Sequence, residues 1–423
     1  MLGERGYSGY QREQYYYGYL LDHRVNDNFS LHQKFRYGKT STNYNMIWSS
    51  LANDGRTVKR DGRLQIYDDT ATSYQIDTYG EAKWDSGAVS HHAVFGIDYR
   101  HGNLKNRSGY GGSMADIDIY DLNYSGAWTL PATALVYQGK SKQTGIYVQD
   151  QIRFGPKWTA TLNGRQDWYE QNGVNPQTGE QTRIDQNAFT GRVGLSYHAT
   201  GELTPYLSYA ESFEPQSGHD RLGNAFVPTT GRQYELGIQY EPSGMNARFT
   251  AALFDLRQQN VLTADPVNTN FSIQTGEVTA KGLELEANME AFKSLSLTAS
   301  FTLLNNKVTK DTNAANIGKR AAVVARHTAA LWLDTARDQQ RQTGWNGGFG
   351  VRYIGSHDNN GYALRLDSVW LADAAVRYNA GDWQYQLNVR NVFDTVHEIA
   401  GFSKTTTFQG DGRTFLLTAT RRW

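Results

Sequence analysis

The sequence of 423 residues contains no cysteine, only 8 prolines and no net charge, because 42 basic side chains balance 42 acidic ones. The lack of cysteine excludes disulfides and thiolate metal sites. The lack of a basic excess argues against nucleic acid as a partner, since phosphate binding needs positive charge. No apolar run approaches the ~18 residues that a membrane-spanning helix needs, and the run at 321–325 is among the longest.

Aromatic residues and glycine are abundant instead, with 27 Tyr, 17 Phe, 10 Trp and 42 Gly. The mean hydropathy of -0.63 is that of a polar chain. Transmembrane β-barrels combine these properties, because lipid-facing and lumen-facing residues alternate and aromatic girdles mark both interfaces. Residues 1–14 show neither the apolar segment nor the cleavage site of a signal peptide. We therefore expect the chain to begin inside a longer protein, either as a fragment or as a truncated reading frame.

Period-two alternation is the strongest pattern in the sequence. It recurs at 233–241, 283–290, 294–303 and 383–390, and the windows long enough for an amphipathic helix do not show helical spacing. In 294–303, serine and threonine alternate with an apolar set of Leu295, Leu297, Ala299, Phe301 and Leu303. One face of each such strand can meet lipid and the other can meet water. The pattern predicts an all-β protein, a transmembrane antiparallel β-barrel.

Short turns alternate with long polar loops along the chain, as in barrels with periplasmic turns and extracellular loops. We expect turns at 26–28, 85–87, 155–157, 200–202, 243–245 and 292–294, and loops near 49–72, 108–140, 172–186, 214–230, 259–275, 311–325, 356–368 and 395–412. Counting hairpins predicts about 17 strands in next-neighbour pairing. The first, at 10–25, and the last, at 413–423, are expected to be edge strands.

Two other β architectures compete with this prediction. A propeller would show a sequence repeat of ~40–50 residues, and none is found. A porin-like passive diffusion barrel has ~16–18 strands, so it is the serious alternative on architecture alone. Porins carry a charged constricting loop, which the sequence does not show.

Several separated segments resemble TonB-dependent receptors, specifically the hydroxamate-siderophore branch that takes ferrichrome and ferrioxamine. The most family-specific block is TPYLSYAESFEPQSG at 204–218, followed by GRQYELGIQYEP at 231–242. Further matches are YLLDHRVNDNFSLHQKFRY at 19–37, KQTGIYVQDQIRF at 142–154, NGRQDWYEQ at 163–171, TGEVTAKGLELEA at 275–287, NVFD at 391–394 and GRTFLLTATRRW at 412–423. The order and spacing of these segments agree with the family. The chain ends on Trp423 where family members usually end on phenylalanine.

The resemblance implies an outer-membrane receptor for a ferric siderophore of the hydroxamate type, energised by the TonB complex. It also implies contact with outer-membrane lipid and lipopolysaccharide, and neither enzymatic activity nor a resident cofactor. Family barrels have ~22 strands and a plugged lumen. Residues 1–423 are therefore expected to be a partial barrel domain, without the plug and roughly the first five strands.

The resemblance also points to ligand-binding residues on the upper barrel wall. A family segment that supplies two contacting aromatics matches Met46 and Trp48, although Met46 lacks the ring. Tyr110 lies near another family contact, and Phe402 matches one in the last long loop. We expect Trp48, Phe402 and Tyr110 at the extracellular end with their rings toward the lumen. The alternative is that these are girdle or loop-packing aromatics.

Other polar clusters are weaker candidates. His91 and His92 are adjacent on a strand, so they face opposite ways and cannot share a metal. The acids Asp68, Asp69, Asp116, Asp118 and Asp121 fall in expected loops and could hold calcium, but solvated loop acids are the commoner case. The dipeptides 219–220 and 357–358, both His-Asp, have no serine at a spacing that implies a triad. We therefore assign no catalytic residue and no metal ligand.

Overall fold

The computed structural model describes residues 4, 6–124, 126–268, 270–292, 295–335, 343–359, 364–401 and 407–421. It consists almost wholly of β-strands, with one short 3-10 helix, η1 (Ala314–Asn316). Within these described ranges, no helix has the length and apolar character needed to cross a membrane.

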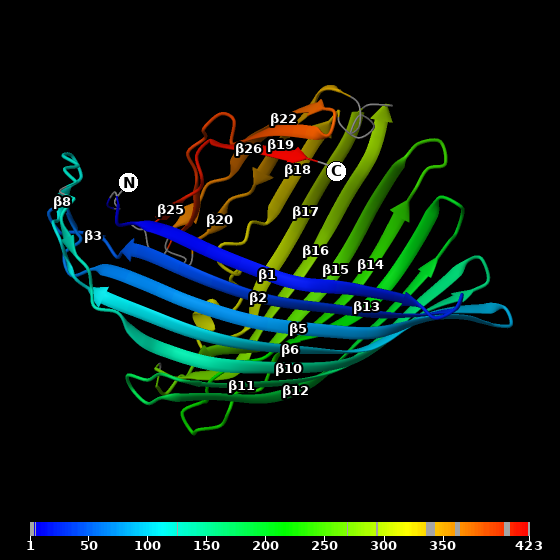
Figure 1. The fold of residues 1–423 in the computed structure, drawn as a ribbon, viewed down its shortest axis with the longest axis horizontal. Helices are drawn as coiled ribbons and strands as arrows, with labels where there is room; N and C mark the ends of the chain where they lie inside the picture. The colour runs from blue at the N-terminus through cyan, green and yellow to red at the C-terminus, as the bar shows by residue number, and fades with distance from the viewer. Residues whose placement is uncertain are drawn as a thin grey trace.

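A single antiparallel sheet of 17 strands forms the wall of the molecule, which confirms the predicted strand number. Its strands are β1 (Gly9–Arg24), β2 (Phe29–Ile47), β5 (Leu64–Ser86), β6 (Val89–Gly111), β10 (Ala134–Phe154), β11 (Trp158–Val174), β12 (Gln181–Tyr197), β13 (Leu203–Glu214), β14 (Thr229–Tyr240), β15 (Ala247–Ala264), β16 (Ser272–Phe292), β17 (Leu295–Lys310), β18 (His327–Asp334), β19 (Gly344–Ile354), β22 (Val369–Ala380), β23 (Trp383–Arg390) and β26 (Thr414–Arg421). Each wall strand pairs with its neighbours along the chain. In Figure 1 the wall curls from β1 in blue, through β12 in green, to β26 in red.

The two end strands lie at the edges of this wall, as expected. In the described part of the chain, β1 pairs with β2 alone and β26 pairs with β23 alone. The two edge strands do not pair with each other there. The wall is therefore a strongly curved open sheet rather than a closed cylinder.

The outer face of the wall is apolar because alternate side chains fall in register from strand to strand. We call a row of residues that face one another across successive strands a rung. One such rung consists of leucines on six neighbouring strands, β12 to β17, namely Leu195, Leu207, Leu236, Leu253, Leu283 and Leu303. Aromatic pairs lie at both ends of this belt. Trp158 contacts Tyr197 and Trp345 contacts Tyr378 on the short-turn side, whereas Tyr19 contacts Phe35 and Tyr353 contacts Trp370 on the long-loop side. This is the surface of a barrel with two aromatic girdles.

The inner face carries charged groups that bond to one another across strands. Arg165 bridges Asp98 at 2.6 Å and the buried Asp167 at 2.6 Å. The hydroxyl of Tyr147 donates to Asp77 at 2.7 Å. Because facing residues of paired strands share a face, these bonds identify the side of the sheet that faces the lumen.

Short turns lie at one end of the wall and long connections at the other, as predicted, but the strands run further into the loops than expected. β5 already begins at Leu64, inside the loop expected at 49–72, and β6 continues to Gly111. Asp68 and Asp69 therefore lie on a strand, opposite Arg107 and Asn106, and not in a loop. Above the membrane both faces of a hairpin are polar, so the apolar alternation stops before the strand does.

Short strands join the long connections. Beyond the end of β2 lie β3 (Ser50–Leu51), β4 (Thr57–Lys59), β7 (Ser113–Met114), β8 (Ile117–Asp118) and β9 (Trp128–Thr129), in which β4 pairs with both β3 and β8. We call these five strands, with Glu4 and Tyr7, the extracellular lobe. Elsewhere β20 (His357–Asp358) pairs with β21 (Arg365–Leu366), and β24 (Glu398–Gly401) pairs with β25 (Thr407–Gln409).

Candidate ligand-binding rim

Two rungs of uncharged side chains line the inner face at the long-loop end of β1, β2, β5 and β6. In the upper rung, Met46 faces Gln65, and Gln65 faces Tyr110. Gln65 is twelve residues from Asp77 on β5, and Tyr110 is twelve residues from Asp98 on β6. An even spacing keeps a residue on the same face of a strand, so this rung points to the lumen like the two acids.

The lower of the two rungs is a ladder of tyrosines. Tyr10 faces Tyr44, and Tyr44 faces Tyr67. Their ring centroids are 6.0 and 6.1 Å apart, within the range of favourable aromatic pairs. We call the two rungs and Trp48 the aromatic rim. Its rings and amide suit a neutral ligand with polar edges better than a strongly charged one.

Trp48 lies just beyond β2 and is held at the rim by two contacts. Its backbone N–H donates to the carbonyl of Arg63 at 3.0 Å, which continues the pairing of β2 with β5. Its indole N–H donates to the side-chain oxygen of Gln65. The residue is 44% exposed, so it is positioned and still accessible.

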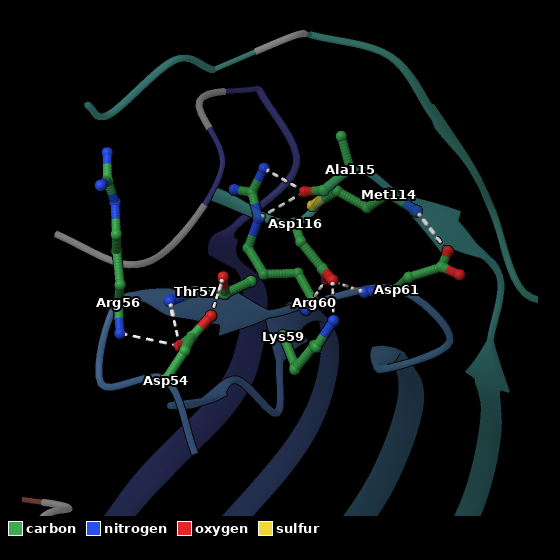
Figure 2. Close-up of polar contacts among 9 residues, drawn as sticks. All are labelled: Asp54, Arg56, Thr57, Lys59, Arg60, Asp61, Met114, Ala115 and Asp116. Atoms are coloured by element: carbon green, nitrogen blue, oxygen red, sulfur yellow. Dashed lines mark hydrogen bonds and ion pairs between the residues drawn. The ribbon is translucent and has the colours of Figure 1, made fainter. Parts of the chain in front are cut away.

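The extracellular lobe beside the rim is fastened by a buried ion pair. Arg60 is completely buried and donates to Glu4 at 3.0 Å, and its guanidinium also donates twice to the carbonyl of Ala115. Figure 2 shows Arg60 pointing into the turn that contains Ala115 and Asp116. These bonds join β4 to the segment before β8, residues far apart in the sequence.

Acids of the lobe are bonded to cations and backbone N–H groups. Asp116 accepts from Lys59 at 2.8 Å and from the backbone of Arg60 at 2.7 Å. Burial would raise the pKa of Asp116, but these hydrogen bonds outweigh it and hold the pKa below its ordinary value. A hydrogen bond to Asp116 raises the pKa of Lys59. The hydroxyl of Thr57, with nearby backbone N–H groups, lowers the pKa of Asp54 to about 2.

A small apolar core joins the lobe to the wall. Tyr7 and Met114 are buried against Leu64 and Ile66, the residues on either side of Gln65. The hydroxyl of Tyr7 donates to the backbone carbonyl of Gln65 at 3.0 Å. Burial raises the pKa of Tyr7 to about 12. The lobe thus packs on the outer face of β5 at the position where the inner face carries the rim.

The structure brings together three of the four ligand contacts that the resemblance implied. Met46, Trp48 and Tyr110 all lie at the rim, around Gln65. Phe402 lies outside the described residues. That these residues bind ligand remains a prediction.

The sequence reasoning missed Gln65 and the tyrosine ladder. Tyr10 and Tyr44 were not singled out, and Gln65 and Tyr67 both fall in the loop that was expected at 49–72. The tight turn at 87–88 fixes which residues of β5 and β6 face each other. Counting outward from this turn along both strands would therefore have predicted that Gln65 faces Tyr110. The pairing of β2 with β5 could not be predicted in this way, because a long connection separates the two strands.

Several of the weaker polar candidates have structural partners. His91 contacts Asp150 on the outer face, whereas His92 contacts Glu81 on the inner face, at 2.7 and 2.8 Å. Asp118 is paired with Arg56. Of the two His-Asp dipeptides, Asp220 accepts backbone N–H groups of its own loop, and His357 is buried with its ring nitrogen 3.0 Å from the carbonyl of Gly355. Within the described residues, no group of three or more potential metal ligands is found.

Comparison with known families places the wall in context. Residues 2–392 match the model of the family described as TonB dependent receptor-like, beta-barrel. The chain is 31% identical to the ferrichrome outer membrane transporter/phage receptor of Escherichia coli K12 over 98% of its own length. It is 30% identical to the ferrioxamine B receptor of Salmonella typhimurium over 93% of its length.

Solved structures show the same fold at lower identity. The siderophore receptor PiuA from Acinetobacter baumannii superposes with a TM-score of 0.82 at 20% identity, covering 99% of this chain and 65% of that one. The ferric-catecholate import receptor Fiu from E. coli, in its closed form, also gives 0.82 at 20% identity, covering 97% and 64%. The chain spans 59% of the ferrichrome transporter and 56% of the ferrioxamine B receptor.

Proposed function

Because the chain belongs to the TonB-dependent receptor β-barrel family, we propose that it forms the wall of a receptor that imports ferric siderophores of the hydroxamate type. Barrels of this family lie in the outer membrane, and the family consists of receptors rather than enzymes. The observation that carries the proposal is the aromatic rim at the long-loop end of the inner face. Two relatives at about 30% identity, named as ferrichrome and ferrioxamine B receptors, support the ligand class.

The chemistry of the rim fits a hydroxamate complex. A ferric trihydroxamate is compact and nearly neutral, so flat rings with a few polar edges suit it better than a charge clamp. The two rungs combine Tyr10, Tyr44, Tyr67 and Tyr110 with Met46 and Gln65, and charged side chains begin only one rung lower, with Arg12 and Asp69. A strongly anionic ligand would find no compensating cation within these rungs.

Energy coupling requires more than this wall. We propose that the wall works within a longer receptor, together with a plug domain through which the TonB complex acts. The matched share of the relatives, below two thirds of their length, supports this arrangement. The passive-porin alternative gains no support from the relatives named above.

A groove on the outer face supports lipopolysaccharide as a second partner. It holds about 500 Å³ and lies on the long-loop side of the aromatic girdle, lined by Lys105 and Lys140 with Asn103, Gln138 and Asn172. Lys142 is on the same face one rung nearer the membrane, opposite Glu170 and His101. In the described structure neither groove lysine has an acidic partner. Exposed ammonium groups above a lipid belt suit the phosphorylated sugars of an outer-leaflet glycolipid.

Growth on single siderophores tests the proposed function. A bacterial strain that lacks siderophore synthesis and its own siderophore receptors would express the full receptor and be starved of iron. We expect ferrichrome or ferrioxamine B to restore growth in a TonB-dependent manner, and an anionic catecholate not to. If only the catecholate restores growth, the hydroxamate assignment is wrong and the barrel assignment stands. Growth on hydroxamates without TonB would favour passive diffusion.

A further inference from the structure

The aromatic rim contains one primary amide, the side chain of Gln65, at its centre. An indole N–H can donate a hydrogen bond but cannot accept one. The contact of Trp48 with Gln65 therefore requires that the amide oxygen, and not the amide nitrogen, faces the indole. Trp48 thus fixes the orientation of the amide, which is otherwise free to be reversed.

This orientation leaves the NH₂ group of Gln65 available. Its two N–H donors have no acceptor in the part of the chain that the structure describes, and the side chain is half-buried between Met46 and Tyr110. The rung faces the lumen, where ligand arrives from outside. Donors placed among apolar rings select for ligands that bring oxygen acceptors to the same position.

We propose that Gln65 is a specificity-determining residue that donates a hydrogen bond to a carbonyl or hydroxamate oxygen of the bound ferric complex. Trp48 acts on ligand choice partly through Gln65, because it occupies the amide oxygen and turns the donors toward the lumen. This inference rests on the proposed function. The bond from Tyr7 uses the backbone carbonyl of Gln65, so a side-chain substitution does not remove it.

Gln65→Glu separates the two roles of the amide. A carboxylate still accepts from the Trp48 indole but offers no donor to a ligand at neutral pH. Gln65→Leu removes both functions. The matched control is Gln75→Glu, the same substitution on β5, ten residues away and therefore on the same inner face, and exposed.

The test uses the full receptor in detergent micelles, with 5-fluorotryptophan incorporated. Equilibrium binding is measured with ferrichrome and with a ferric catecholate, and Trp48→Phe identifies the fluorine signal of Trp48. We expect Gln65→Glu to weaken ferrichrome binding about tenfold or more, the effect of one lost hydrogen bond of about 1.4 kcal/mol. The Trp48 signal should stay near its original position in Gln65→Glu and move in Gln65→Leu. Gln75→Glu should bind as the unsubstituted receptor does.

Three results would overturn the inference. The first is ferrichrome binding by Gln65→Glu as tight as that of the unsubstituted receptor. The second is an equal loss of binding in Gln75→Glu, which would make the effect one of added charge. The third is a shift of the Trp48 signal in Gln65→Glu, which would make the role one of positioning alone. Failure of the proposed function looks different. In that case the unsubstituted receptor itself fails to bind ferrichrome, and if it binds the catecholate instead, the same variants are compared on that ligand.

Discussion

Replacing Arg60 with methionine is expected to open the extracellular lobe while the barrel wall stays intact. The guanidinium is 0% exposed, its partner Glu4 has a side chain 1% exposed, and the two are 3.0 Å apart. The substitution removes this bond and two bonds to the carbonyl of Ala115, at 2.9 and 2.7 Å. It also leaves a buried carboxylate without a partner.

The expected cost is large for a single side chain. Removing one member of a buried ion pair typically destabilises by ~3–5 kcal/mol, because the remaining charge stays out of water. If the lobe opens as a local unit, its amide protection against hydrogen exchange should fall by a factor of about 10²–10⁴, since ~1.4 kcal/mol is tenfold. The strands of the wall should keep their protection.

Hydrogen exchange read by mass spectrometry on peptides from 48–63 and 112–124 measures this effect. Lys59→Met is the matched control, because Lys59 lies next to Arg60 but forms its ion pair with Asp116 at the surface, with 49% of the lysine side chain exposed. The control should change exchange far less. Changing Glu4 to methionine as well should recover part of the protection, since it removes the orphaned charge. Unchanged protection in Arg60→Met would refute the view that this pair fastens the lobe.

Three further predictions concern the rim, the lobe and the outer groove. Trp48→Ala should weaken ferrichrome binding by ~1–3 kcal/mol in equilibrium titrations, the usual cost of losing a contact aromatic. The lowered pKa of Asp54, about 2 against an ordinary 3.8, means that its ionised form stabilises the loop above pH 3.8 and that this stability is lost as the pH falls toward 2. Cleavage of the loop by pepsin should therefore rise over that interval. Replacing Lys105 and Lys140 with glutamate should reduce the lipopolysaccharide that copurifies with the receptor.

Each of these predictions has a control. Tyr17→Ala removes an outward-facing aromatic and should leave ferrichrome affinity unchanged; equal losses in both variants would contradict a specific role for Trp48. In Asp54→Asn residue 54 cannot titrate, so the rise in pepsin cleavage on acidification, normalised to an unstructured substrate, should be smaller than in the unsubstituted receptor. A single Lys34→Glu on the inner face should not alter bound lipopolysaccharide. If it lowers the bound amount as much as the groove variant does, the lipopolysaccharide assignment fails.

The wall could be predicted from sequence because the lipid dictates its pattern. Lipid-facing positions such as Leu283 and Leu285 alternate with lumen-facing ones such as Glu284, and this period is readable without a structure. The number of strands could be predicted from the positions of the turns. The lengths of the strands could not, because around Asp68 the chain lies outside the membrane, where neither face of a strand needs to be apolar and the alternation is lost.

The rim could be predicted only in part. Resemblance located Met46, Trp48 and Tyr110 one by one, but not their common neighbour. Gln65 lies beside Met46 because of the register of β5 with β2. A long connection joins these two strands, and its length does not indicate which residues pair. The bond that orients its amide comes from Trp48, a residue beyond the end of a strand, where periodicity gives no information on side-chain direction.

The location of iron in a complex tests the central claim most directly. The full receptor would be crystallised with ferrichrome, and the iron located by anomalous scattering at its absorption edge. We predict one iron peak on the lumen side of the wall, next to the rung of Met46, Gln65 and Tyr110 and within reach of Trp48. An iron peak remote from this rung, or a ferrichrome-saturated receptor with no iron in the lumen, would contradict the account.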